Sequence, residues 1–154
     1  MTTNRQRRFW QREPDKGVVT LVGAGPGGAD LITVRGARAL AAADVIVYDT
    51  PIDRDLLGLA DVGTERIGVG TRPDLAAASI NAVVIEHALA GRHVVRLMIG
   101  DPFMCGSGID EAAELRARGI DVDVVPGVPT QHATPWLAAA PLAGRPHGAA
   151  TFVA

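Results

Sequence analysis

Three glycines near the start of the chain have the spacing of a nucleotide-binding turn. Gly23, Gly25 and Gly28 lie in the stretch LVGAGPGGADLI, residues 21–32, and give the pattern G-x-G-x-x-G. Such a turn brings the backbone close to a pyrophosphate. Asp49 lies about 20 residues further on, where a dinucleotide-binding fold places the acid that binds a ribose hydroxyl. The pattern indicates an FAD- or NAD-binding Rossmann domain as one hypothesis.

The helix that a dinucleotide site requires does not start at the right place. In that fold the helix begins inside the glycine motif, so that its N-terminus faces the pyrophosphate. Here the apolar residues at helical spacing begin only after Asp30. Because a single G-x-G-x-x-G is also a weak signal, the Rossmann domain is a distant alternative.

Apolar periodicity predicts strands that alternate with helices. Strands are expected over 17–23, 44–49, 65–70, 93–100 and 121–127, and helices over 31–44, 73–91, 109–119 and 130–140. Asp74 is expected to cap the second helix, and Pro135 must lie near the first turn of the last helix or break it. Parallel strands need crossover connections, so this order predicts an α/β fold, a three-layer domain with a five-stranded parallel sheet.

The loops that follow the predicted strands indicate where a ligand would bind. Four of the five, GAGPGG, GVGTR, IGDPFMCGSG and PGVPT, are rich in glycine or proline, and the fifth is YDTP. In parallel sheets ligands bind beyond the carboxyl ends of the strands. Glycines allow close approach of the backbone to a ligand, although ordinary turns favour the same residues. We therefore expect a pocket at this edge of the sheet.

Composition excludes several classes of function. The chain has 154 residues, 47% of them apolar, and its 15 basic and 17 acidic residues give a net charge of −2. This balance predicts no nucleic-acid partner, and no apolar run is long enough to span a membrane. The single cysteine, Cys105, excludes an internal disulfide and favours a cytoplasmic location. The four histidines show no ligand spacing, so no metal site is predicted.

Taken together, the loops resemble those of the tetrapyrrole methylases. The resemblance runs from Val18 to about Pro146 and is carried by VTLVGAGPGGADLITVRGARALAAADVIVYD, by Ile80 and Asn81, by GRHVVRLMIGDPFMCGSGIDEAAEL and by GIDVDVVPGVPT. It implies a C-methyltransferase of sirohaem and cobalamin synthesis that uses S-adenosyl-L-methionine as cofactor. The tetrapyrrole substrate implied is uroporphyrinogen III, and the product is precorrin-2.

The resemblance also implies roles for particular residues. Those expected at the cofactor are Pro26, Ile99, Gly100, Asp101, Met104, Pro129 and Thr130. Asp49 matches the family's proposed proton acceptor, and a capping or loop-bonding aspartate is an equal alternative. Arg72 matches an arginine that would meet substrate carboxylates, or it is a solvated loop residue. For Asp101 the alternative to a cofactor contact or loop shaping is a helix N-cap.

The chain departs from the family pattern at several of these loops. Thr71 stands where the family has its proposed proton-donor lysine, and a hydroxyl supplies neither the charge nor the acidity. Further differences are Met98, Ile99, Ser107, Ile109 and Pro129. Three basic groups are lost in total, which should weaken binding of a polyanionic substrate.

The resemblance implies a cleft between two domains, of which this chain carries one. We expect a flexible basic leader over 1–16, the N-terminal α/β domain over 17–140, and a linker with the truncated start of a second domain over 141–154. A homodimer, or a chain that supplies the second domain, is the expected partner. We expect the chain alone to be weakly active or inactive, and a non-catalytic remnant or interaction module is the alternative. Trp136 and Leu137 are expected in an exposed apolar patch.

Overall fold

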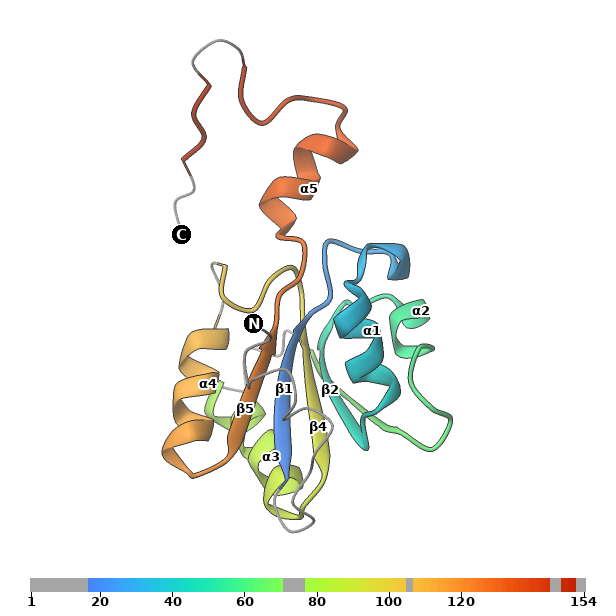
Figure 1. Cartoon of the computed structure of the whole chain (residues 1–154), viewed down its shortest axis with the longest axis vertical. Helices are drawn as coiled ribbons and strands as arrows, with labels where there is room; N and C mark the ends of the chain where they lie inside the picture. Colours follow the sequence, from blue (N-terminus) through green and yellow to red (C-terminus); the bar gives the residue numbers. More distant parts are fainter. Residues whose placement is uncertain (1–16, 71–76, 105–106, 145–147, 152–154) are drawn as a thin grey trace, which may run out of the picture.

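A computed structural model describes residues 17–70, 77–104, 107–144 and 148–151 of the chain. Its strands are β1 (Val18–Gly23), β2 (Val45–Thr50), β3 (Glu65–Gly70), β4 (His93–Met98) and β5 (Asp121–Val125). Its helices are α1 (Val34–Ala41), α2 (Arg54–Leu57), α3 (Ala77–Leu89), α4 (Gly108–Ala117) and α5 (Thr130–Leu137), with a 3-10 turn at Ala29–Leu31. Figure 1 shows these elements along the chain.

The five strands form one sheet in the order β3-β2-β4-β1-β5, and all paired strands are parallel. The predicted α/β class and five-stranded parallel sheet are therefore confirmed. β4 is buried along its whole length, because both of its faces are covered by helices. All strands run in one direction, so their carboxyl ends meet at a single edge of the sheet, here called the carboxyl edge.

Two hydrophobic clusters cover the two faces of the sheet. On one face, Val84 of α3 and Leu115 of α4 pack with Leu21 and Val94. On the other face, Leu40 of α1 and Leu56 of α2 pack with strand residues that include Val22, Ile46, Val95 and Leu97. Successive strand residues point to opposite faces of the sheet, and both faces are covered. The strands are therefore apolar at most positions and do not alternate between apolar and polar residues.

Three helices differ from the sequence prediction. α1 begins at Val34 rather than near Leu31, because the Thr33 side chain accepts a hydrogen bond from the Gly36 amide at 3.1 Å and caps the helix there. The short α2 was not predicted, since four residues give no periodicity. Pro135 lies inside α5, past its first turn, and the helix continues to Leu137. The expectation for Pro135 was wrong, because α5 is short and exposed and a single lost backbone hydrogen bond does not end it.

α5 extends beyond the carboxyl edge, away from the sheet (Figure 1). Trp136 is 65% exposed and Leu137 is 66% exposed, so the expected apolar patch is confirmed. Asp74, the predicted helix cap, lies outside the described residues. In the part of the chain that the structure describes, no helix combines the length and apolarity that crossing a membrane requires.

Candidate functional site at the carboxyl edge

The loops after β1 and β4 are joined by backbone hydrogen bonds. The Gly25 amide donates to the Gly100 carbonyl at 3.1 Å, and the Gly100 amide donates to the Gly25 carbonyl at 2.9 Å. Both glycines have positive φ angles, 76° at Gly25 and 69° at Gly100. A side chain is strained in this conformation, so glycine is required at both ends of the bridge. The bridge makes the first glycine loop and the loop after β4 a single unit.

Close packing of three backbones extends this unit to the loop after β5. A Cβ atom on Gly23 would lie 2.5 Å from the Gly100 carbonyl oxygen and 2.5 Å from the Gly127 nitrogen. A Cβ atom on Gly127 would likewise lie 2.1 Å from the Gly100 carbonyl oxygen. Neither Gly23 nor Gly127 tolerates a side chain, because the neighbouring atoms belong to the backbone and cannot rotate away. These glycines therefore serve contact between loops. Gly27 differs, because a Cβ atom there would meet nothing within 4 Å.

Asp101 holds the loops after β4 and β5 together. Its Oδ2 accepts a hydrogen bond from the Gly127 amide at 3.0 Å, and its Oδ1 accepts one from the Phe103 amide at 2.8 Å. α4 begins only at Gly108, with Ser107 in the capping position. The helix N-cap considered for Asp101 is thus excluded for α4, and this aspartate shapes the loops.

The residues predicted at the cofactor lie on loops of the carboxyl edge, except Thr130, which is the first residue of α5. The Met104 amide donates to the Asp101 carbonyl at 3.2 Å, and a Cβ atom on Gly100 would lie 3.4 Å from Cγ2 of Thr130. Pro26 is half-buried beside the Gly25 bridge, and Pro129 occupies the N-cap position of α5. Thr71 and Arg72 lie outside the described residues.

Asp49 lies at the end of β2 and contacts two groups of β4 and its loop. Its Oδ1 is 2.6 Å from Nη2 of Arg96, and its Oδ2 accepts a hydrogen bond from the Ile99 amide at 3.2 Å. The side chain of Asp49 is 27% exposed, so part of it faces solvent. These contacts agree with the alternative of an aspartate that bonds to a loop. The Asp49 carboxylate still has lone pairs that can accept further hydrogen bonds.

Arg96 and Glu111 complete a buried ionic cluster with Asp49. The Arg96 side chain is 2% exposed, and its Nε donates to Oε2 of Glu111, which is 4% exposed, at 3.0 Å. The Arg96 Nη1 donates to the Leu97 carbonyl at 3.2 Å. Ser107 donates from Oγ to Oε1 of Glu111 at 2.6 Å. Sequence reasoning missed this cluster, although a lone arginine in the apolar run HVVRLM is a signal, because a buried arginine needs partners.

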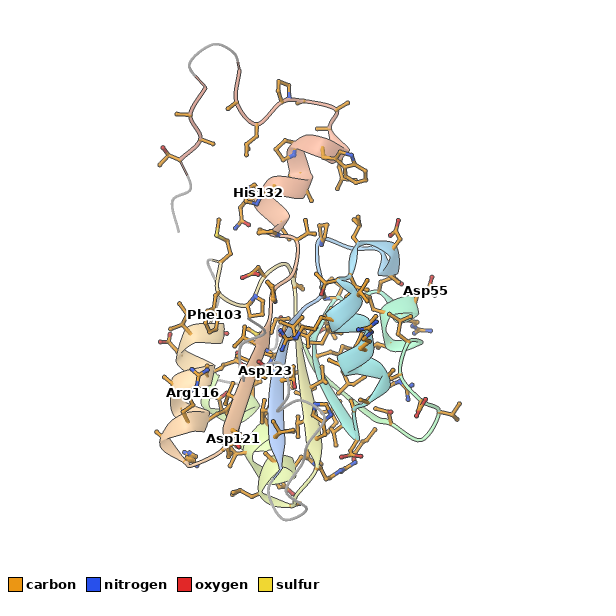
Figure 2. The ribbon with its side chains drawn as sticks, in the orientation of Figure 1. Asp55, Phe103, Arg116, Asp121, Asp123 and His132 are labelled. Carbon is orange, nitrogen blue, oxygen red and sulfur yellow. The ribbon has the colours of Figure 1, made fainter. Side chains whose placement is uncertain are left out.

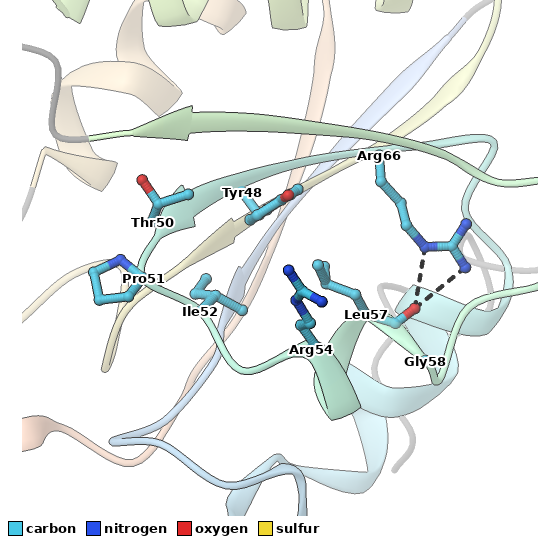
Figure 3. A pocket seen from close by; sticks show the side chains of 8 residues that line it. All are labelled: Tyr48, Thr50, Pro51, Ile52, Arg54, Leu57, Gly58 and Arg66. Carbon is cyan, nitrogen blue, oxygen red and sulfur yellow. Dashed lines mark hydrogen bonds between the residues drawn. The ribbon is translucent and has the colours of Figure 1, made fainter.

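A hollow of about 620 Å³ lies between the end of β2 and α2 (Figure 3). It is lined by Tyr48, Thr50, Pro51, Ile52, Arg54, Leu57, Gly58 and Arg66. None of the predicted cofactor residues lines it. The Arg66 guanidinium is bound to backbone carbonyls, among them those of Leu57 at 3.2 Å and Thr64 at 2.6 Å. Arg66 therefore joins β3 to the segment after α2.

The fold and the joined loops define a class of parallel α/β domain, in which ligands generally bind at the carboxyl edge of the sheet. Residues 18–152 match the family model of the Tetrapyrrole (Corrin/Porphyrin) Methylases. The chain belongs to this family, as the loop motifs predicted.

In the described part of the chain no group of three or more His, Cys, Asp or Glu residues is placed to hold a metal ion.

Curated relatives agree with this assignment. The chain is 42% identical over 132 residues to a uroporphyrinogen-III C-methyltransferase of Methanocaldococcus jannaschii, covering 84% of this chain and 54% of the relative. It is 43% identical over 148 residues to a siroheme synthase of Methylococcus capsulatus, covering 94% of this chain and 31% of the relative. The chain thus spans about half the length of the first of these relatives and about a third of the second.

Solved structures show the same fold. A uroporphyrin-III C-methyltransferase from Thermus thermophilus has a TM-score of 0.75 and 36% identity, over 85% of this chain and 56% of that one. A structure of the Thermus thermophilus enzyme complexed with S-adenyl homocysteine has a TM-score of 0.70 and 39% identity, over 84% of this chain and 51% of that one.

Proposed function

We propose that this chain forms the S-adenosyl-L-methionine-binding half of a C-methyltransferase that converts uroporphyrinogen III to precorrin-2. The observation that carries the proposal is the continuous unit made by the loops after β1, β4 and β5 in a chain of this family. The names of the relatives and the complex of one of them with S-adenyl homocysteine support it. Because the chain spans about half of the C-methyltransferase relatives, the activity of the whole protein is part of the proposal.

Several groups at the carboxyl edge support the proposal of a cationic adenosyl ligand. Ile99 and Phe103 are each 44% exposed and offer apolar surface for an adenosine. The open space over Gly27 leaves the backbone beside Pro26 accessible. Asp49 adds a carboxylate that contacts the same loop through the Ile99 amide. A few polar groups among apolar surface are typical of a cofactor site.

We assign the binding of the cofactor to the loops and the loss of a proton to Asp49. The proposed cofactor-binding residues are Pro26, Ile99, Gly100, Asp101, Met104, Pro129 and Thr130. When bound, S-adenosyl-L-methionine supplies an electrophilic methyl group. The chain's contribution is to align the ligands and exclude water, and Asp49 is the proposed acceptor of the proton that the methylated carbon must release. Arg72 is proposed to bind substrate carboxylates.

Further elements of the proposal concern partners and location. A tetrapyrrole substrate is proposed, together with a second copy or another chain that supplies the opposite wall of the cleft. Sedimentation analysis of the purified chain tests for the second copy. The single cysteine is consistent with the proposed cytoplasmic location.

Calorimetric titration of the purified chain tests the cofactor. We expect binding of S-adenosylhomocysteine and no binding of NADH or FAD. Absence of adenosylhomocysteine binding up to millimolar ligand would refute the proposed cofactor. Tight binding of FAD would instead support a dinucleotide site. The position of α1, which begins after Thr33 and outside the glycine motif, argues against that result.

A second candidate is a non-catalytic module with the same fold, and Thr71 is the residue that favours it. A methyl-transfer assay with labelled S-adenosyl-L-methionine and uroporphyrinogen III distinguishes the two. We expect little or no turnover by the chain alone, and none restored by Thr71→Lys. Measurable transfer by that single variant would show that the lysine position alone limits activity.

A further inference from the structure

The ionic cluster at the carboxyl edge carries one more negative charge than positive charge. Among the residues that the structure describes, Arg96 is the only cation in this cluster, and it contacts two carboxylates, those of Asp49 and Glu111. The Ser107 hydroxyl adds a hydrogen bond to Glu111 and no charge. With both carboxylates ionised, the formal sum is one negative charge. The ligand that suits such a cluster is a cation.

The excess charge is accessible only at Asp49. Arg96 and Glu111 are 2% and 4% exposed and are paired inside the domain, and the Ser107 bond holds Glu111 in this arrangement. Asp49 is 27% exposed. A buried guanidinium already paired with one buried carboxylate leaves the second carboxylate with incompletely compensated charge. That charge faces the exposed side of the cluster.

Asp49 also lies beside the loop that is proposed to bind the cofactor, so its negative charge would act on the bound cofactor. Its Oδ2 accepts the Ile99 amide hydrogen bond, which places the carboxylate against the first residue of the Ile99–Asp101 stretch. The other carboxylate of this stretch, Asp101, uses both of its oxygens to bind loop amides. Asp101 therefore shapes the loops. Asp49 also uses both oxygens, one on the Ile99 amide and one on Arg96, but it shares that single guanidinium with Glu111 and is partly exposed.

We propose that Asp49, backed by the Arg96–Glu111 pair, makes the site selective for the charge of the cofactor. It favours the cationic sulfonium of S-adenosyl-L-methionine over the neutral thioether that remains after methyl transfer. This inference rests on the proposed function and adds a specificity-determining residue to it. Its consequence is that loss of the methyl group lowers the affinity of the site for the product and assists its release.

Two adenosyl ligands that differ in charge test the inference on the full chain by calorimetry. Sinefungin carries an ammonium in place of the sulfonium methyl and does not react, and S-adenosylhomocysteine is neutral at the same position. We expect Asp49→Asn to lower sinefungin affinity roughly tenfold, with a change of less than about twofold for S-adenosylhomocysteine. Asp121→Asn is the matched control, because this exposed residue at the start of β5 lies at the opposite edge of the sheet (Figure 2). The control should leave both affinities unchanged.

The outcomes separate this inference from the proposed function. If neither ligand binds the unaltered chain, both the proposed cofactor and the inference are refuted. If S-adenosylhomocysteine binds, and Asp49→Asn weakens both ligands equally or neither, only the inference is refuted. Should the variant fail to fold, the unaltered chain provides the test, because salt screens a partly exposed charge. The ratio of sinefungin to S-adenosylhomocysteine affinity must then fall as ionic strength rises, and a constant ratio would refute the inference.

Discussion

Arg96 is the residue whose loss should be most costly to the ionic cluster. Arg96→Met would leave the buried Glu111 without its cation, and removal of one partner of a buried pair costs about 3–5 kcal/mol. We expect the free energy of unfolding, measured with urea and circular dichroism, to fall by about this amount. Arg96→Met combined with Glu111→Leu should recover part of the loss, because no unpaired buried charge remains between these two positions. A single variant as stable as the unaltered chain would contradict this prediction.

The close contacts of Gly127 give a second prediction for a single residue. Gly127→Ala would force a methyl group against the Gly23 and Gly100 backbones, so we expect a loss of at least about 1–3 kcal/mol of stability. Gly27→Ala is the matched control and should change stability by less than about 0.5 kcal/mol, since open space surrounds that position. Thermal unfolding of the two variants tests the difference, and equal losses would show that the loops are not packed as described.

Single residues were partly predictable from the sequence. The strand-end loops could be located because glycine and proline cluster there, and the family motifs placed the proposed cofactor residues on these loops or, for Thr130, at the start of α5. The partners of these residues could not be derived, because the Asp49–Arg96 pair and the Asp101–Gly127 bond join segments distant in the chain. For the same reason, the role of Gly23 and Gly127 in loop packing follows only from the structure.

At the level of secondary-structure elements, the ion pair between Glu65 of β3 and Arg92, just before β4, predicts that stability depends on pH. The hydrogen bond from Arg92 to Glu65 at 2.7 Å is the main cause that lowers the pKa of Glu65. A carboxyl with a lowered folded-state pKa stabilises the fold above its unfolded pKa, and this stabilisation is lost as pH falls through the folded pKa. The effect should be small, because both side chains are partly exposed to solvent, which screens their interaction.

Glu65→Gln should remove this contribution at neutral pH and make unfolding less sensitive to acid. The measurement is the urea midpoint as a function of pH below neutrality, with the exposed Glu86→Gln as control. If the pH dependence of Glu65→Gln matched that of the unaltered chain, the pair would not contribute to stability.

Strands were more predictable than helices. β3 matches its predicted range, residues 65–70, and the other strands differ by a few residues at their ends. Runs of β-branched residues define strands locally, whereas helix boundaries depend on caps such as that of Thr33. α2 also depends on a cap, since the Asp53 side chain accepts a hydrogen bond from the Asp55 amide at 3.0 Å.

For the whole molecule, the exposed part of α5 predicts self-association. Trp136 and Leu137 of α5, and Leu142 in the segment after it, leave apolar surface in solvent, and such surface favours contact with another apolar surface. We expect Trp136→Ser combined with Leu137→Gln to lower the average mass measured by sedimentation at high protein concentration, while circular dichroism stays unchanged. The exposed Val62, on the segment between α2 and β3, provides a control as Val62→Ser. A mass unaffected by the α5 change would show that this surface does not mediate association.

The class of the fold and the parallel sheet were predictable, because alternating strands and helices permit few arrangements. The strand order was not predicted, since local sequence does not state which strands become neighbours.

The position of β1 between β4 and β5 has a consequence for synthesis of the protein. Both neighbours of this first strand come from the second half of the described chain, so β1 has no paired strand until His93 and the residues after it are made. Pairing between strands so distant in sequence is slow, because a long loop must close first. The glycine loop that follows β1 is held by Gly100 and Gly127, so it takes its final shape only when the ribosome has passed β5. Binding of the proposed cofactor by nascent chains of increasing length should therefore appear abruptly once this point is passed.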